Sequence, residues 1–284
     1  MRRVHTSRLA PLIGFLLIGG ATWAGSEPGP KVPFKLHRGH LIVVQGSIGQ
    51  LKGRNFVIDT GATSTVISQA VARKLGLKGR AHKATAFGRR IALKKVLIPE
   101  IRLGGFRFPA VTALIHNLHF FQGIRVDALI GLDLLKISNL GIDFSSKTLS
   151  FGEMSHSVHS MNFYTKAPYV MLRMEVDGVP LCLKLDSGAG TYLLLYRGRV
   201  NGRFAWRLTD EFRTVRHLGG KAKARKVFLI KVRMADTEWG ELAALLLTER
   251  QPSPGTLDGA VGLGALGLSN LQIDFQRGLM SWAK

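Results

Sequence analysis

The stretch Phe56-Val57-Ile58-Asp59-Thr60-Gly61-Ala62 joins an apolar run to Asp, a hydroxyl residue, Gly and Ala. The stretch Leu183-Lys184-Leu185-Asp186-Ser187-Gly188-Ala189 repeats that order 127 residues later. A single Asp-Thr-Gly is a common turn sequence, so one copy would indicate little. Two copies predict a pair of carboxylates, Asp59 and Asp186, that face each other. Such a pair can share one proton and act as general base and general acid.

A second pair of matching segments follows at nearly the same offset. Leu129-Ile130-Gly131-Leu132 corresponds to Ala260-Val261-Gly262-Leu263, which lies 131 residues further on. The pattern Ser-Asn-Leu-x-Ile-Asp-Phe then closes both halves, at 138–144 and at 269–275. A repeat of this length is too long for a solenoid unit and indicates two similar lobes. One small insertion in the second half accounts for the difference of four residues between the two offsets.

Short apolar segments between glycine turns predict a mostly β fold with a few short helices. The β-rich segments 41–44 and 55–58, with glycine turns between them, predict a hairpin, and residues 84–115 alternate between apolar and polar groups as strands do. Asp177-Gly178 predicts another hairpin turn. Ser68 and Gly76 bound one expected short helix. We therefore expect an all-β chain in which two pseudo-twofold-related lobes form a site in the cleft between them.

The N-terminal segment has the pattern of a secretory signal peptide. Three arginines precede an apolar run over 9–20, and the small residues Ala21 and Ala24 follow. Export without disulfides fits a bacterial periplasm, since Cys182 is the only cysteine. An uncleaved membrane anchor is the alternative. The predicted division is a signal peptide at 1–24, a linker at 25–33, a first lobe at 34–153, a bridge at 154–166 and a second lobe at 167–284.

The formal net charge of +22 raises the question of an acidic partner. No zinc-finger spacing, helix-turn-helix signal or aromatic RNA-binding run accompanies the charge, so we expect no nucleic-acid partner. A charged, solvated surface explains much of the excess. Association with a membrane surface, through the basic charge or the N-terminal segment, remains an expectation to test.

These residues resemble the pepsin and retropepsin clan of aspartic proteases, from about residue 34 to the end. In that clan each lobe carries Asp-Thr/Ser-Gly and, many residues later, two apolar residues and Gly. The resemblance implies an aspartic endopeptidase acting on polypeptides, with a water activated between Asp59 and Asp186. It also implies that the supporting residues of the two catalytic loops are Thr60, Gly61, Ser187 and Gly188, and that those of the apolar-Gly strands are Ile130, Gly131, Val261 and Gly262.

Two features of the chain bear on how such an enzyme would work. Ala62 and Ala189 stand where pepsins usually have a hydroxyl residue, which predicts a pH optimum closer to neutral. The hairpins expected to cover the substrate lie at 84–91 and 214–227, and both are basic, which favours acidic stretches of substrate. The flap candidates at their tips are Phe87, Gly88, Gly219 and Gly220.

Two alternatives stay open from the sequence. One is a catalytically inactive relative that binds peptides or serves as a structural envelope protein. The other is an enzyme whose dyad forms between two chains, although we expect a monomer rather than a dimer. No cofactor is expected. No metal is expected either, because the paired histidines His116 with His119 and His156 with His159 lack helical periodicity around them.

Overall fold

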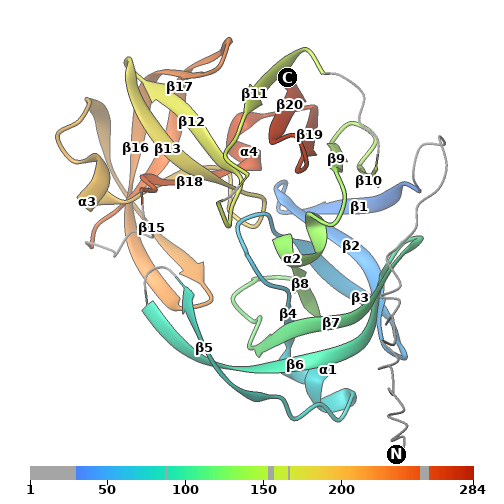
Figure 1. Cartoon of the computed structure of the whole chain (residues 1–284). Helices are drawn as coiled ribbons and strands as arrows, with labels where there is room; N and C mark the ends of the chain where they lie inside the picture. Colours follow the sequence, from blue (N-terminus) through green and yellow to red (C-terminus); the bar gives the residue numbers. More distant parts are fainter. Residues whose placement is uncertain (1–29, 87–88, 153–156, 166, 250–255) are drawn as a thin grey trace, which may run out of the picture.

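The computed structural model describes residues 30–86, 89–152, 157–165, 167–249 and 256–284. Nearly all regular structure there is β, with four short helices, which confirms the all-β prediction. Two β-rich bodies lie side by side, one formed by the blue-to-green half of the chain and the other by the yellow-to-red half (Figure 1). The predicted signal peptide at 1–24 lies outside the described residues. No helix in the described ranges has both the length and the apolar character to cross a membrane.

The first lobe contains ten strands and two helices among its described residues. Its strands are β1 (Val32–His37), β2 (Leu41–Ile48), β3 (Leu51–Ile58), β4 (Val66–Ser68), β5 (Arg80–Ala86), β6 (Arg89–Leu103), β7 (Phe106–His116), β8 (Ala128–Ile130), β9 (Leu140–Asp143) and β10 (Thr148–Phe151). Its helices are α1 (Gln69–Lys74) and α2 (Leu132–Leu135).

The second half follows the same general plan. Its strands are β11 (His159–Asn162), β12 (Met171–Val176), β13 (Val179–Asp186), β14 (Leu193–Leu195), β15 (Trp206–His217), β16 (Gly220–Met234), β17 (Thr237–Leu247), β18 (Gly259–Gly262), β19 (Asn270–Asp274) and β20 (Leu279–Ala283). Its helices are α3 (Arg197–Val200) and α4 (Leu263–Leu266). Strand β11 lies inside the segment predicted as a bridge, and β1 begins inside the predicted linker.

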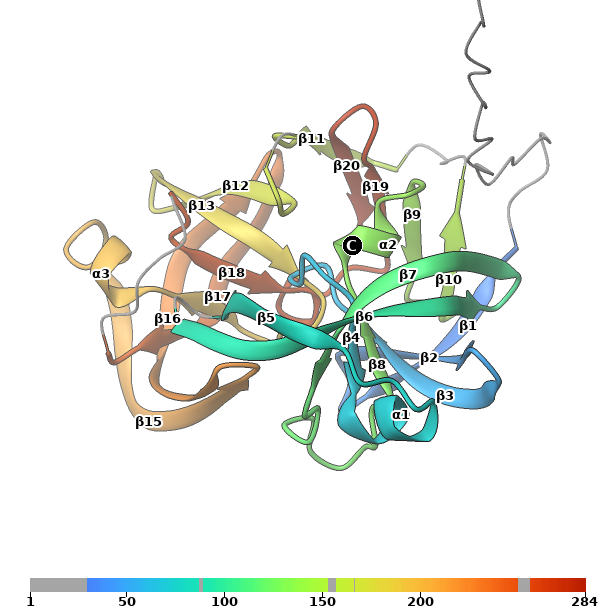
Figure 2. The ribbon, with the colours of Figure 1, turned by 60° about the horizontal axis from the view of Figure 1, so that its bottom comes forward.

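The two lobes repeat one strand connectivity around their Asp motifs. In the first lobe β3 pairs in parallel with β8, while β4 pairs antiparallel with β8 and in parallel with β7. In the second lobe β13 pairs in parallel with β18, while β14 pairs antiparallel with β18 and in parallel with β17. Each Asp motif therefore ends a central strand held beside an apolar-Gly strand, as Figure 2 also shows for β13 and β18.

A shared sheet joins the lobes away from the Asp motifs. Strand β9 of the first lobe pairs antiparallel with β19 of the second, in a register that places Ile142 opposite Leu271. The neighbouring strands follow in the order β11-β20-β19-β9-β10-β1. Ile142, Leu271 and Trp282 are fully buried in this region. Because one sheet crosses the boundary, the hydrogen bonds of both lobes help to fix their relative position.

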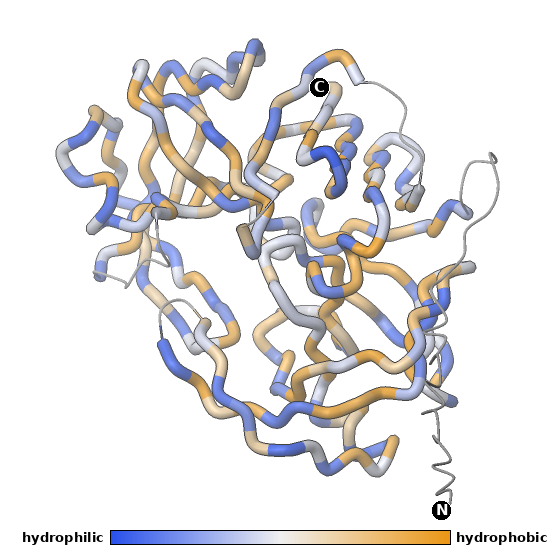
Figure 3. The backbone as a smooth tube through the Cα atoms, in the orientation of Figure 1, coloured by the Kyte–Doolittle hydropathy of each residue, from blue (hydrophilic) through white to orange (hydrophobic). Residues whose placement is uncertain are grey.

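Local sequence signals explain several element boundaries. The Ser68 hydroxyl accepts a hydrogen bond from the backbone N–H of Val71 at 3.2 Å, and Gly76 has a φ of +66° just after α1. Asp177 and Gly178 both have positive φ, as a two-residue hairpin turn requires. Both predicted elements are confirmed. Apolar residues line the strands of both lobes in Figure 3, in keeping with cores built from alternating positions.

Candidate active site

The two Asp residues are brought together from opposite lobes. Asp59 directly follows β3, and Asp186 is the last residue of β13. A Cβ placed on Gly61 would lie 2.2 Å from Cγ of Asp186, and one placed on Gly188 would lie 2.6 Å from Cγ of Asp59. Each loop therefore packs its glycine against the carboxyl group of the other lobe. Any side chain at these two glycines would displace a carboxylate.

Hydroxyl groups beneath the carboxylates cross-link the two loops. The backbone N–H of Thr60 donates to Oγ of Ser187 at 2.9 Å, and the backbone N–H of Ser187 donates to Oγ1 of Thr60 at 3.0 Å. Each hydroxyl also donates to a carbonyl of the opposite lobe, Ser187 to Ile58 at 2.8 Å and Thr60 to Leu185 at 3.1 Å. Both side chains are fully buried, so these four hydrogen bonds satisfy groups that water cannot reach.

The apolar-Gly strands support the loops from behind. Ile130 pairs with Ile58, and Val261 pairs with Leu185, and all four are buried. The glycines that follow have no room for a side chain: a Cβ on Gly131 would lie 2.7 Å from the backbone of Ser64, and one on Gly262 would lie 2.0 Å from the carbonyl oxygen of Gly190. This lack of room for a side chain explains why Gly follows the apolar pair in both halves.

Lys184 is a member of this site that the sequence reasoning did not identify. Its Nζ lies 3.0 Å from Oδ2 of Asp186 and donates to the carbonyl oxygen of Gly61 at 2.9 Å. The side chain is only 12% exposed. The sequence did contain a signal for Lys184. It lies two residues before Asp186 in the same strand, and residues two apart in a strand point to the same face. At the 127-residue offset the first lobe has Val57, so the lysine breaks the symmetry between the lobes.

Burial and neighbouring charges shift the pKa values of Asp59 and Lys184. Burial away from water, followed by the negative charge of Asp186, raises the pKa of the Asp59 carboxyl to about 7. The Lys184 charge and a hydrogen bond from the Gly61 N–H at 2.8 Å act in the opposite direction. Burial by itself would lower the pKa of Lys184, but the charges of Asp186 and Asp59 outweigh it and raise that pKa. The site can therefore hold a proton on a carboxyl group near neutral pH.

Other repeated carboxylates anchor strands and lie outside the dyad. The buried Asp127 accepts the backbone N–H of Asn55 at 3.2 Å, and the buried Asp258 accepts that of Cys182 at 2.9 Å. Their spacing of 131 residues was a readable signal that the sequence reasoning missed. In the first lobe Asp133 also fixes the catalytic loop, because it accepts both the N–H and the hydroxyl of Thr65.

The repeated Asp143 and Asp274 serve the turns of the closing hairpins. Asp143 accepts the backbone N–H of Ser146 at 2.8 Å, and Asp274 accepts that of Arg277 at 2.8 Å. Cys182 is half-buried on β13, and burial raises the pKa of its thiol, which keeps it protonated. Within the described ranges, no three His, Cys, Asp or Glu side chains gather where they could hold a metal ion.

The two basic hairpins meet at their ends. They are β5–β6 in the first lobe and β15–β16 in the second, and Phe87 and Gly88 lie outside the described residues. Gly219 lies in the turn between β15 and β16, and Gly220 is the first residue of β16. A Cβ on Gly219 would lie 2.9 Å from the carbonyl oxygen of Ala86. Figure 1 shows β5 and β15 approaching from opposite lobes.

Comparison with known proteins finds a match to one protein family over part of the chain. Residues 44–134 match the model of the aspartyl protease family. The chain resembles a retropepsin-like aspartic protease. The match contains Asp59 and the first apolar-Gly strand, while Asp186 and the second lobe lie beyond it. The structure of a retropepsin-like aspartic protease from Rickettsia conorii aligns with this chain at 19% sequence identity and a TM-score of 0.33. The alignment covers 43% of this chain and 90% of the Rickettsia chain. No curated protein matches the chain.

Proposed function

We propose that this protein is a single-chain aspartic endopeptidase that hydrolyses peptide bonds with a water activated by Asp59 and Asp186. The reciprocal packing of Gly61 on Asp186 and of Gly188 on Asp59 carries this proposal. This packing supports a pair of carboxyl groups that lie together, that of Asp59 buried and that of Asp186 13% exposed, on loops that buried hydrogen bonds connect. The aspartyl protease match over 44–134 supports the same class of reaction.

The chemistry needs one ionised and one protonated carboxyl group. The carboxylate takes a proton from water as the water oxygen bonds to the carbonyl carbon, and the protonated carboxyl gives its proton to the carbonyl oxygen. A tetrahedral diol results. The C–N bond then breaks as the first carboxyl gives its proton to the nitrogen, and a diol hydroxyl returns a proton to the second. The products are an acid and an amine, and the dyad is restored.

Hydrogen bonds within one chain favour a dyad built by a monomer. Thr60 and Ser187 connect the loops inside the same chain, and β9 pairs with β19 at the lobe boundary. Activity per molecule should therefore stay constant on dilution. A loss of specific activity on dilution would instead indicate that the dyad forms between two chains.

Peptide hydrolysis with and without pepstatin tests the mechanism. Asp59→Asn and Asp186→Asn should each abolish cleavage while the protein stays folded. Asp177→Asn is the matched control, because Asp177 lies in the β12–β13 turn, at the other end of β13 from Asp186. Unchanged cleavage in both dyad variants would reject the mechanism. Binding of peptides by the folded wild-type protein without any cleavage would instead identify an inactive relative.

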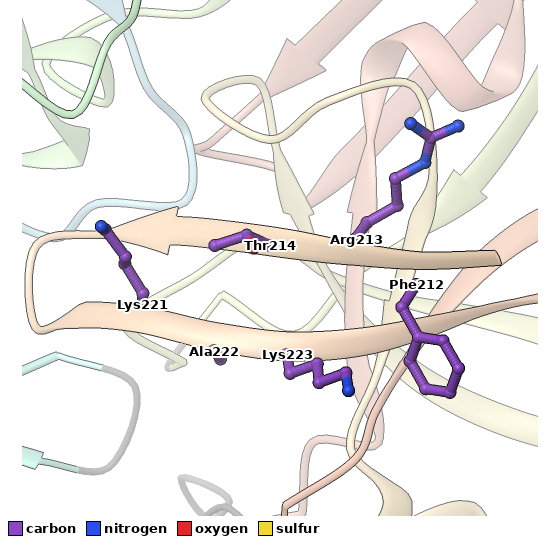
Figure 4. Close-up of a pocket in the computed structure, with 6 residues that line it drawn as sticks. All are labelled: Phe212, Arg213, Thr214, Lys221, Ala222 and Lys223. Carbon is purple, nitrogen blue, oxygen red and sulfur yellow. The ribbon is translucent and has the colours of Figure 1, made fainter.

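The basic hairpins support a preference for acidic stretches of polypeptide. On β15–β16, Nζ of Lys223 lies 4.4 Å and the guanidinium of Arg225 5.8 Å from the ring centroid of Phe212. This arrangement combines cations with an aromatic surface, and either could contact an extended substrate. Figure 4 shows the side chains that line a hollow of about 320 Å³ on this hairpin: Phe212, Arg213, Thr214, Lys221, Ala222 and Lys223.

We also propose that the N-terminal segment directs export to the periplasm, on the basis of its basic, apolar and small-residue pattern. Fusion of residues 1–30 to a reporter that is active only outside the cytoplasm tests this. Replacing the leader arginines should weaken export, and a reporter that stays inactive would reject the proposal.

A further inference from the structure

Lys184 makes the two halves of the dyad chemically different. It lies two residues before Asp186 on β13, so its side chain extends along the same face of the strand. Its Nζ is 3.0 Å from Oδ2 of Asp186, and both side chains are about one-eighth exposed. In the first lobe the corresponding Val57 is fully buried and carries no charge. One member of the dyad therefore has a cation beside it that the other lacks.

The ammonium group is held in place by more than its ion pair. It donates to the carbonyl oxygen of Gly61 at 2.9 Å, and this atom belongs to the loop of the opposite lobe. The ring of Tyr169, just before β12, lies 5.2 Å from Nζ on another side. With so little exposure, the lysine has few alternative positions, and it connects Asp186 to the loop that carries Asp59.

The charged and titratable groups around the lysine come from several elements. Asp59 approaches from the first lobe and Asp186 from β13 itself. Tyr196, after β14, is nearly buried, and burial raises its pKa, so that it stays neutral beside the pair. Tyr169 adds a neutral ring. At neutral pH one cation thus faces two carboxyl groups, and the smallest buried net charge arises when a single carboxyl group is ionised.

We propose that Lys184 is a positioning residue that holds Asp186 as the ionised member of the dyad and thereby leaves the shared proton on Asp59. This inference rests on the proposed function, because it assigns the two roles within the same reaction. Asp186 then takes the proton from water, and Asp59 gives its proton to the substrate carbonyl oxygen. The lysine touches neither water nor substrate in this scheme and acts through Asp186.

A pH–rate profile of three variants tests whether the Lys184 charge acts on the dyad at all, which the proposal requires. Lys184→Met removes the charge at similar length, and Lys184→Arg keeps it. Lys231→Met removes an exposed lysine that pairs with Asp177, at the other end of β13 from Asp186. Because Lys184 lowers the pKa of Asp59, the alkaline limb of kcat/KM in Lys184→Met should move to higher pH by about one unit. The limb should stay near its wild-type position in Lys184→Arg and Lys231→Met.

An unmoved alkaline limb in Lys184→Met would overturn the proposal. An increase in kcat at every pH would also overturn it, because the lysine would then inhibit the enzyme.

A measurement without substrate separates this proposal from the proposed function. Carbon NMR of carboxyl-labelled aspartate, assigned with Asp59→Asn and Asp186→Asn, reports which carboxyl group carries the proton. In the wild-type protein at pH 6, Asp59 should be protonated and Asp186 ionised. A proton on Asp186 would overturn the proposal even if the enzyme is active. The expected titration in a protein without peptidase activity would leave the role of Lys184 in place and reject the function. The wild-type spectrum also decides the matter if Lys184→Met does not fold.

Discussion

Thr60 and Ser187 exchange hydrogen bonds across the lobe boundary, each backbone N–H donating to the hydroxyl of the other residue at 2.9 and 3.0 Å. Neither residue is accessible to water. The backbone of each catalytic loop is therefore tied to a side chain of the other lobe. The spacing of the two carboxyl groups above these residues depends on this exchange.

Ser187→Ala should weaken both stability and activity. It removes the acceptor of the Thr60 N–H and leaves that buried donor unpaired, which costs about 1–3 kcal/mol in the free energy of unfolding. The loops would lose one of their links, so cleavage should fall more steeply than stability predicts. Chemical denaturation and kcat measurements check this. Ser160→Ala, at an exposed position of β11, is the control. Equal effects of the two substitutions would contradict the role of Ser187.

Gly61→Ala should abolish activity while the fold persists. The added methyl group would lie 2.2 Å from Cγ of Asp186, and the carboxylate can avoid it only by leaving Lys184 and Asp59. Gly190→Ala is the matched control, because a Cβ there meets no atom within 4 Å. Thermal unfolding and peptide cleavage measure the two effects. An active Gly61→Ala enzyme would show that the close packing of glycine on carboxylate is not required.

The sequence predicted those parts of the site that are short continuous motifs present in both halves of the chain. Two Asp-hydroxyl-Gly runs and two apolar-Gly runs are visible without a structure, because each is a continuous stretch at the end of a strand. Ser68 and Gly76 likewise mark α1 through their own backbone preferences. Such signals are short-range, so they survive in a single sequence.

Contacts between distant segments were not predictable in the same way. The ion pair of Lys184 with Asp186 follows from strand period, but its hydrogen bond to the Gly61 carbonyl requires the packing of two lobes. The pairing of β9 with β19 and the addition of β11 at the edge beside β20 belong to a sheet that spans the lobe boundary. Strand β11, which lies within the segment predicted as a bridge, forms the edge of that sheet through its pairing with β20.

Asp59→Asn should change how stability depends on pH. The folded-state pKa of Asp59, about 7, lies above the ordinary value of 3.8. The folded state thus holds this proton more tightly than the unfolded state. The stability it contributes is complete below pH 4 and is lost as pH rises through 7. Asn cannot ionise, so the free energy of unfolding of Asp59→Asn should rise relative to that of the wild type between pH 4 and pH 8. The gain should be on the order of a few kcal/mol at most. Denaturation midpoints at several pH values check this, with Asp177→Asn as control. A difference that does not grow with pH would contradict the raised pKa.

Reversing charge on the β15–β16 hairpin should weaken cleavage of acidic peptides. Lys221 and Lys223 are exposed beside the hollow on this hairpin, so their charges can attract carboxylates of an extended substrate. Lys221→Glu with Lys223→Glu should lower kcat/KM for an acidic peptide by about tenfold at low salt, and the effect should shrink as salt screens the charges. Cleavage of a neutral peptide should change little. Lys52→Glu with Lys78→Glu, at exposed positions of the first lobe, alters net charge equally and serves as control. If both pairs slow the acidic peptide to the same extent, the cause is net charge, and the hairpin has no special role in selecting the substrate.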